Sequence, residues 1–109
     1  MGHGFQDAVS FELARRIADG LPQHPEWIDL ARSNIERWTR LNSDASSLLR
    51  CYREWSELLD RPVVEICTAL IANTEEGQRI RQNSPFASVL SPGEVWEIKA
   101  RIRHATPAA

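Results

Sequence analysis

The stretch PVVEICTALIA, from Pro62 to Ala72, decides which fold class the chain adopts. Its β-branched residues would suit a buried strand, because valine and isoleucine are enriched in sheets. However, proline at the first position is favourable in the first turn of a helix, and the apolar residues recur at three- and four-residue intervals. We therefore predict a helix that is apolar nearly all round and central in the fold. Its apolar residues at helical spacing are Val63, Ile66, Cys67, Leu70 and Ile71.

The segments before this stretch carry the same helical spacing, and glycine and proline separate them. Helices are expected over residues 7–19, 25–41 and 45–59. Gly20 ends the first of these, and the second has a clear amphipathic stripe of aliphatic and tryptophan side chains. The first helix also carries a second apolar line, which is typical of a helix that docks on a neighbour. That line is formed by Phe11, Ala14 and Ala18.

Two further helices and a loop are expected after the stretch. Thr74 caps a short helix that ends near Asn83, because Ser84 precedes a proline and is therefore biased away from helical geometry. Ser91 and Glu94 form a capping box at the start of the last helix. Between these helices, three apolar side chains are expected to enter the core from an irregular loop. They are Phe86, Val89 and Leu90.

Length and composition favour a single domain. The chain has 109 residues, of which 42% are hydrophobic and 26% charged, as in an ordinary globular protein. We expect one helical domain over residues 1–109, with frayed ends at residues 1–6 and 105–109. The predicted fold is all-α, a compact bundle of five or six short helices with the helix near 62–72 at its centre.

Charge and hydropathy point to a soluble protein. The formal net charge is −2, so no overall basic field would draw the chain to nucleic acid or to a membrane. No apolar run is long enough to cross a bilayer, and the first ten residues do not resemble a secretory signal. Lys99 is the only lysine among 13 basic residues, which is typical of G+C-rich coding DNA. We expect a bacterial, cytoplasmic protein with its two cysteines reduced.

The spacing of reactive side chains does not indicate a catalytic or metal site. Cys51, Cys67, His24 and His104 give none of the short ligand spacings of a zinc site. The three histidines are scattered over the termini and a turn, where no nucleophile pairs with them. The five glycines are dispersed, so no phosphate-binding loop is present. We therefore expect no catalytic residue, no metal and no cofactor, and a non-enzymatic interaction or regulatory module.

A polar recognition surface is predicted near the C-terminal third, where GQRIRQN runs from Gly77 to Asn83. Arginine would form forked hydrogen bonds with an acidic partner, and Trp96 would supply apolar contact area. The partner would be another protein or a second copy of the chain. Alternatively, the arginines pair with carboxylates such as Glu75 and Glu76, and the aromatic residues complete a monomeric core. The predicted contact residues are Gln78, Arg79, Arg81, Gln82, Trp96 and Arg103.

The competing interpretation is a nucleic-acid-binding regulator. The helices near 62–72 and 75–83 would form a helix-turn-helix, in which arginine, glutamine and asparagine read base edges. Three features count against it: Glu75 and Glu76 would meet phosphate at the helix N-terminus, the connection lacks the glycine common in such turns, and the net charge is slightly acidic. Protein binding is therefore the preferred hypothesis.

Overall fold

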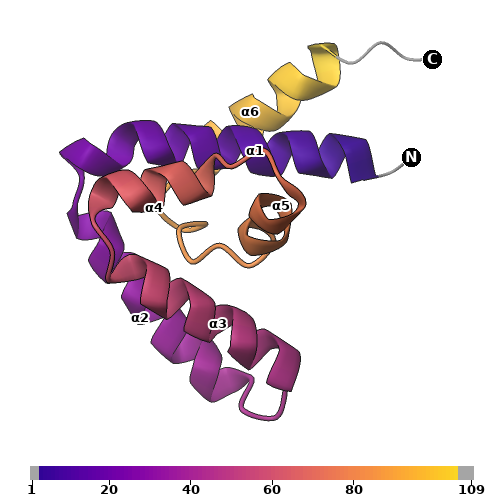
Figure 1. Ribbon diagram of the computed structural model, residues 1–109. Coiled ribbons are helices and arrows are strands. Elements are labelled where there is room, and N and C mark those ends of the chain that lie inside the picture. Colours follow the sequence, from indigo (N-terminus) through magenta and orange to yellow (C-terminus); the bar gives the residue numbers. More distant parts are fainter. Residues whose placement is uncertain (1–2, 106–109) are drawn as a thin grey trace.

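The computed structural model describes residues 3–105, which form six α-helices and one 3-10 turn without any strand (Figure 1). The predicted all-α fold is confirmed, including the helix inside the stretch 62–72. The expected fraying of residues 1–2 and 106–109 lies outside the described residues. In chain order the elements are α1 (His3–Gly20), η1 (Leu21–Gln23), α2 (Glu26–Leu41), α3 (Ser46–Leu59), α4 (Val63–Leu70), α5 (Glu75–Arg81) and α6 (Pro92–Ala105).

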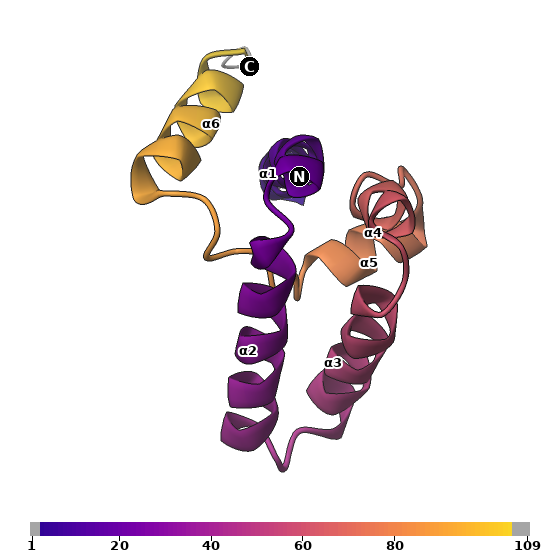
Figure 2. The ribbon, with the colours of Figure 1, turned by 90° about the vertical axis from the view of Figure 1, so that its left-hand side faces the viewer.

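The helices are arranged in two parts, one around α1 and one formed by α2 and α3. Helix α1 lies in the middle of the first part, with α6 on one side and α4 and α5 on the other (Figure 2). Helices α2 and α3 run side by side away from it as a hairpin, and the rings of Trp38 and Tyr52 meet between them at 5.7 Å. The radius of gyration is 14.3 Å, slightly above the roughly 13 Å typical of 100 residues. The projecting hairpin accounts for the difference.

Helix α4 is less central than predicted, and α1 takes that position. Ile66 and Leu70 are completely buried, but Val64 is 70% exposed on the outer face of α4. Helix α1 can be covered on both sides because its apolar residues form two lines. Ala14 and Ile17 are both buried, and the small alanine lets neighbouring backbones approach closely. The second apolar line on α1 was thus the better indicator of the centre.

The loop between α5 and α6 enters the core, as predicted. Phe86 is fully buried and Leu90 is 7% exposed. The Phe86 ring meets the edge of Trp55 at 6.0 Å between ring centroids, a favourable aromatic geometry. The indole N–H of Trp55 donates to the carbonyl oxygen of Ile80 at 3.0 Å. This loop therefore packs against α3 through Phe86.

Both predicted helix starts have the expected caps. The hydroxyl of Thr74 accepts a hydrogen bond from the Gly77 N–H at 3.0 Å. At the start of α6, the Ser91 N–H donates to the Glu94 carboxylate at 3.0 Å, and the Glu94 N–H donates to the Ser91 hydroxyl at 3.1 Å. These bonds satisfy backbone donors that the first turn leaves unpaired. Helix α1, by contrast, begins at His3 rather than near residue 7.

Candidate functional site

Arg79, one of the predicted contact residues, is held by carboxylates of the chain itself. Its guanidinium donates to both carboxylate oxygens of Glu54 on α3, at 2.6 and 3.3 Å, and also to Glu76 one turn away on α5. The hydrogen bonds to Glu54 and then to Glu76 raise the pKa of Arg79 above its ordinary value. The same contact lowers the pKa of Glu76. Arg79 therefore ties α5 to α3, as the alternative of internal pairing anticipated.

Arg81 is buried, although it was predicted to face a partner. It is 7% exposed, and its Nη1 donates to the carbonyl oxygens of Leu70 at 3.2 Å and Ala72 at 2.7 Å. These carbonyls lie at the C-terminal end of α4, where backbone acceptors lack helical partners. The guanidinium also lies 5.1 Å from the centre of the Phe11 ring on α1. Arg81 thus joins three helices and is not available to a partner.

Burial perturbs Arg81 electrostatically. Desolvation lowers its pKa, and the nearby charge of Asp7 opposes that effect. Its Nε is buried and has no hydrogen-bond partner among the described residues. The sequence signal that could have identified this residue is its spacing from Gly77. The two lie one turn apart, and both are buried on the inner face of α5.

The remaining α5 candidates are exposed but do not join those on α6. Gln78 and Gln82 are both exposed. Helices α5 and α6 lie on opposite sides of α1 (Figure 2), which separates the helix of Gln78 from the helix of Trp96. Gln82 lies closer to α6. It lines a hollow together with Ala87, and Ala87 also lines a groove beside Trp96. The single predicted surface is therefore divided.

A groove runs along the start of α6 and the loop before it. Its volume is about 550 Å³, and its lining is mostly apolar. Trp96 is 71% exposed at this groove, in line with its position one residue beyond the inward face of the helix. Leu90 and Val95 join the groove to the core. The lining residues are Ala87, Ser88, Leu90, Pro92, Val95, Trp96 and Lys99.

Two cations follow Trp96 along α6. Lys99 and Arg103 come three and seven residues later, which places them on the same flank of the helix. The Arg103 guanidinium lies 5.6 Å from the centre of the Phe5 ring, within the range of a cation–π contact. Among residues 3–105, no carboxylate forms a salt bridge with either Lys99 or Arg103. We call the groove together with Trp96, Lys99 and Arg103 the α6 surface.

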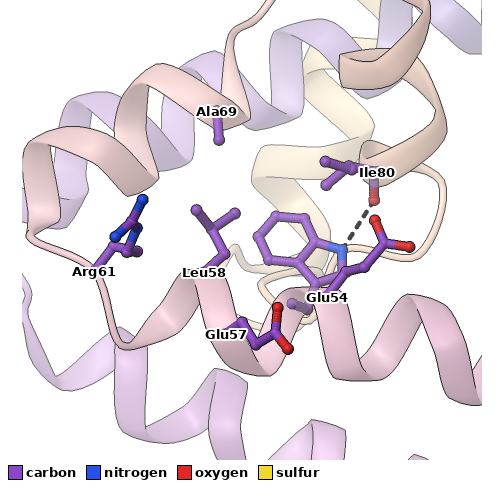
Figure 3. A pocket seen from close by; sticks show the side chains of 7 residues that line it. Glu54, Glu57, Leu58, Arg61, Ala69 and Ile80 are labelled. Atoms are coloured by element: carbon purple, nitrogen blue, oxygen red, sulfur yellow. Dashed lines mark hydrogen bonds between the residues drawn. The ribbon is translucent and has the colours of Figure 1, made fainter.

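A second groove, of about 470 Å³, lies between α3, α4 and α5 (Figure 3). Figure 3 shows Leu58 between Arg61 at one end and Glu54 and Ile80 at the other. Its charged rim is largely paired within the chain, because Glu54 binds Arg79 and Arg61 lies 3.5 Å from Glu65. No pattern in the sequence predicts this groove. Helical spacing marks Glu54 and Glu57 as surface residues but does not show that an apolar hollow separates the helices.

Reactive groups are dispersed in the described part of the chain. No cluster of three or more histidine, cysteine, aspartate or glutamate side chains within residues 3–105 could hold a metal ion. The Cys67 thiol donates to the Ala18 carbonyl at 3.4 Å. Burial, followed by the charge of Asp19, raises the pKa of this thiol, which disfavours the nucleophilic thiolate. His24 stacks on Trp27 and lies 3.1 Å from Glu26 in an exposed turn.

Comparison with known proteins gives no match to a family model, to a curated protein or to a solved structure. Within the described residues, no helix combines the length and the apolar character needed to span a membrane.

Proposed function

We propose that this chain is a non-enzymatic interaction module that binds another protein, or a second copy of itself, through the α6 surface. The observation that carries the proposal is the 71% exposure of Trp96 beside an apolar groove. Tryptophan is the residue type most enriched among energetically dominant interface positions, usually within a pocket that excludes water. An exposed tryptophan beside a hollow of this kind is therefore well suited to anchor a partner.

The possible energetic gain is large for one residue. Tryptophan side chains bury roughly 150–250 Å² when covered. At about 25 cal/mol per Å², covering the exposed part of Trp96 would contribute about 3 kcal/mol. Two other strongly exposed apolar residues, Leu41 and Val64, line neither of the two grooves. Single exposed aliphatic residues are normal on protein surfaces, whereas a groove with an aromatic wall is characteristic of binding sites.

The contact set differs from the one predicted from sequence. Trp96 and Arg103 stay in it, and Lys99 joins them as the charged residue that lines the groove. Gln82 lines a neighbouring hollow that shares Ala87 with the groove, and Gln78 lies apart on α5. Arg79 and Arg81 leave the set, because their donors already serve the fold. An acidic partner would therefore meet cations on α6 rather than on α5.

The nucleic-acid alternative loses support on α5. Its predicted recognition helix keeps Gln78 and Gln82 exposed, but both arginines are engaged within the chain. Duplex binding depends strongly on cations that neutralise phosphates. A salt titration separates the two hypotheses, because binding to duplex DNA would fall steeply with rising salt. Failure of the protein to bind heparin at low salt would argue against the alternative.

A matched pair of variants tests the proposed function. Trp96→Ala removes the anchor, whereas Leu41→Ala removes an apolar side chain of similar exposure, 74%, at the far end of the hairpin. Each variant is compared with the wild type by chemical crosslinking and affinity capture from cells that make the protein. We expect a defined crosslinked partner, or a crosslinked dimer, that Trp96→Ala loses and Leu41→Ala retains. Identical crosslinking patterns in all three proteins would contradict the proposal.

A further inference from the structure

Charge is unevenly distributed around α6. At 3.6 residues per turn, Pro92, Trp96, Lys99 and Arg103 fall within one sector of about 60°. The acidic side chains of the helix, Glu94 and Glu97, fall with Arg101 and His104 in a separate sector of about 80° that faces away from the first. The flank beside the groove therefore carries two positive charges and no carboxylate from α6.

The other wall of the groove adds no negative charge. The loop over residues 82–91 contains no charged side chain, so Lys99 is the one charged residue among those that line the groove. The groove is thus an apolar hollow with a cationic edge. Opposite charge on a ligand is favoured there, because nothing in the lining competes for Lys99.

A third cation lies beyond the loop, on α2. The buried Asn34 side chain donates to the Ser88 hydroxyl and to the Pro85 carbonyl, both at 2.9 Å. Its oxygen accepts a hydrogen bond from Arg37 at 2.9 Å. Ser88 lines the groove, so two hydrogen bonds connect Arg37 to it. Arg37 is exposed and forms no salt bridge with a carboxylate within residues 3–105, but its hydrogen bond to Asn34 already engages it within the fold.

We propose that the α6 surface takes an acidic amphipathic segment of a partner protein. This inference rests on the proposed function and specifies the chemistry of the partner. An apolar side chain enters the groove against Trp96, and carboxylates beside it meet Lys99 and Arg103. The seven residues from Trp96 to Arg103 span about 10.5 Å, or two helical turns. A helical ligand with one apolar stripe and acidic residues beside it matches that spacing.

Two designed probes test the charge requirement directly. The first is a fluorescent helical peptide of about 18 residues, with leucines along one face and glutamates beside them. The second carries lysine at every glutamate position. Fluorescence anisotropy measures the binding of each peptide to the full chain. We expect the glutamate peptide to bind the wild type at least about tenfold more tightly than the lysine peptide does, because electrostatic complementarity discriminates between partners.

Charge reversal on α6 should exchange this preference. We expect Lys99→Glu combined with Arg103→Glu to weaken binding of the glutamate peptide about tenfold and to strengthen binding of the lysine peptide. Arg101→Glu, on the other flank, is the matched control and should leave the affinity within about twofold. Far-UV circular dichroism of each variant shows whether it has kept its helices. Trp96→Ala should weaken the binding of both peptides.

Three results would overturn the inference. The first is that the wild type binds the two peptides equally or not at all. The second is that the double reversal leaves the glutamate peptide bound as tightly as before. In either case the proposed function would still stand if Trp96→Ala abolished partner crosslinking. The third is that a single-stranded oligonucleotide, or a second copy detected by light scattering, occupies the same residues more tightly than the peptide.

Discussion

Helices α5 and α6 both present basic side chains, but they use them in opposite ways. On α5, Arg79 and Arg81 bind groups of the chain itself and connect α5 with α1, α3 and α4. On α6, Lys99 lines an apolar groove and Arg103 follows one turn later on the same flank, and neither forms a salt bridge among residues 3–105. The difference shows that a basic residue indicates a binding surface only once the acceptors within its own fold are known.

The largest expected effect concerns Arg81. Arg81→Ala removes charged hydrogen bonds to two carbonyl oxygens and the contact with Phe11, so we expect a loss of about 3 kcal/mol in the free energy of unfolding. Urea denaturation followed by circular dichroism measures it. Arg81→Met separates packing from hydrogen bonding, because it keeps most of the volume without the donors. A loss no larger than that of Arg103→Ala would remove the contrast between the two helices.

A smaller but still large effect is expected at Gly77. A Cβ at this position would clash with the Ala72 carbonyl oxygen, which is backbone and cannot move aside freely. We expect Gly77→Ala to destabilise the fold by about 2 kcal/mol, despite the better helix propensity of alanine. Gly93→Ala on α6 is the matched control, because its Cβ would meet only the Ser91 hydroxyl oxygen at 3.9 Å. Equal stability of the two variants would show that the α4–α5 connection does not approach Gly77 this closely.

The bridge between Arg79 and Glu54 should have a smaller effect, because both side chains keep more than a third of their surface exposed. A double-mutant cycle with Arg79→Ala and Glu54→Gln isolates the coupling between them. We expect a favourable coupling well below the loss caused by Arg81→Ala. A coupling as large as the loss caused by Arg81→Ala would show that the fold depends on this pair more than its exposure suggests.

Acid should weaken the other ion pair of Arg79, the one with Glu76. The folded-state pKa of Glu76 lies below its ordinary value of 4.5, because Arg79 donates to it. A lowered folded pKa means that the stabilisation is complete above pH 4.5 and is lost as the pH falls through the folded value. We expect Arg79→Ala to reduce the acid-induced loss of stability relative to the wild type. Denaturation curves at pH 6 and pH 3 measure the free energy of unfolding of both proteins. An equal decrease between the two pH values in the wild type and in Arg79→Ala would contradict this prediction.

The smallest effect on stability is expected on α6. Lys99→Ala and Arg103→Ala should each change the free energy of unfolding by less than about 0.5 kcal/mol, because both residues are exposed and form no ion pair in the described part of the chain. The same substitutions should still weaken the binding of the glutamate peptide in the anisotropy assay. Large destabilisation by Arg103→Ala would instead give its contact with Phe5 a mainly structural role.

Much of the fold could be predicted from local patterns. The spacing of apolar residues identified the helices, and the caps at Thr74 and Ser91 marked two of their starts. The core position of Phe86 could also be predicted, because it is a large apolar residue in the short loop between two helices. Helix α1 begins at His3 rather than near residue 7, and its Phe5 ring contacts Arg103, which lies far away in the sequence. No local pattern signals such a contact.

The candidate site was only partly predictable. The exposure of Trp96 followed from its position beside the inward face of α6, which is a property of one helix. The division between α5 and α6 did not, because it depends on which sides of α1 they occupy. Similarly, Arg32 donates to the Leu59 carbonyl and to Asp60 from 27 and 28 residues away. Such acceptors come together only through long-range packing.

The sequence by itself determined the class of the fold, the helix boundaries set by caps and prolines, and the faces of each helix that avoid water. These properties arise from interactions between residues a few positions apart. Only the tertiary structure decided that Arg79 and Arg81 serve the fold while Lys99 and Arg103 stay available. A guanidinium binds whichever acceptors lie within reach, and the packing of distant segments determines which acceptors those are.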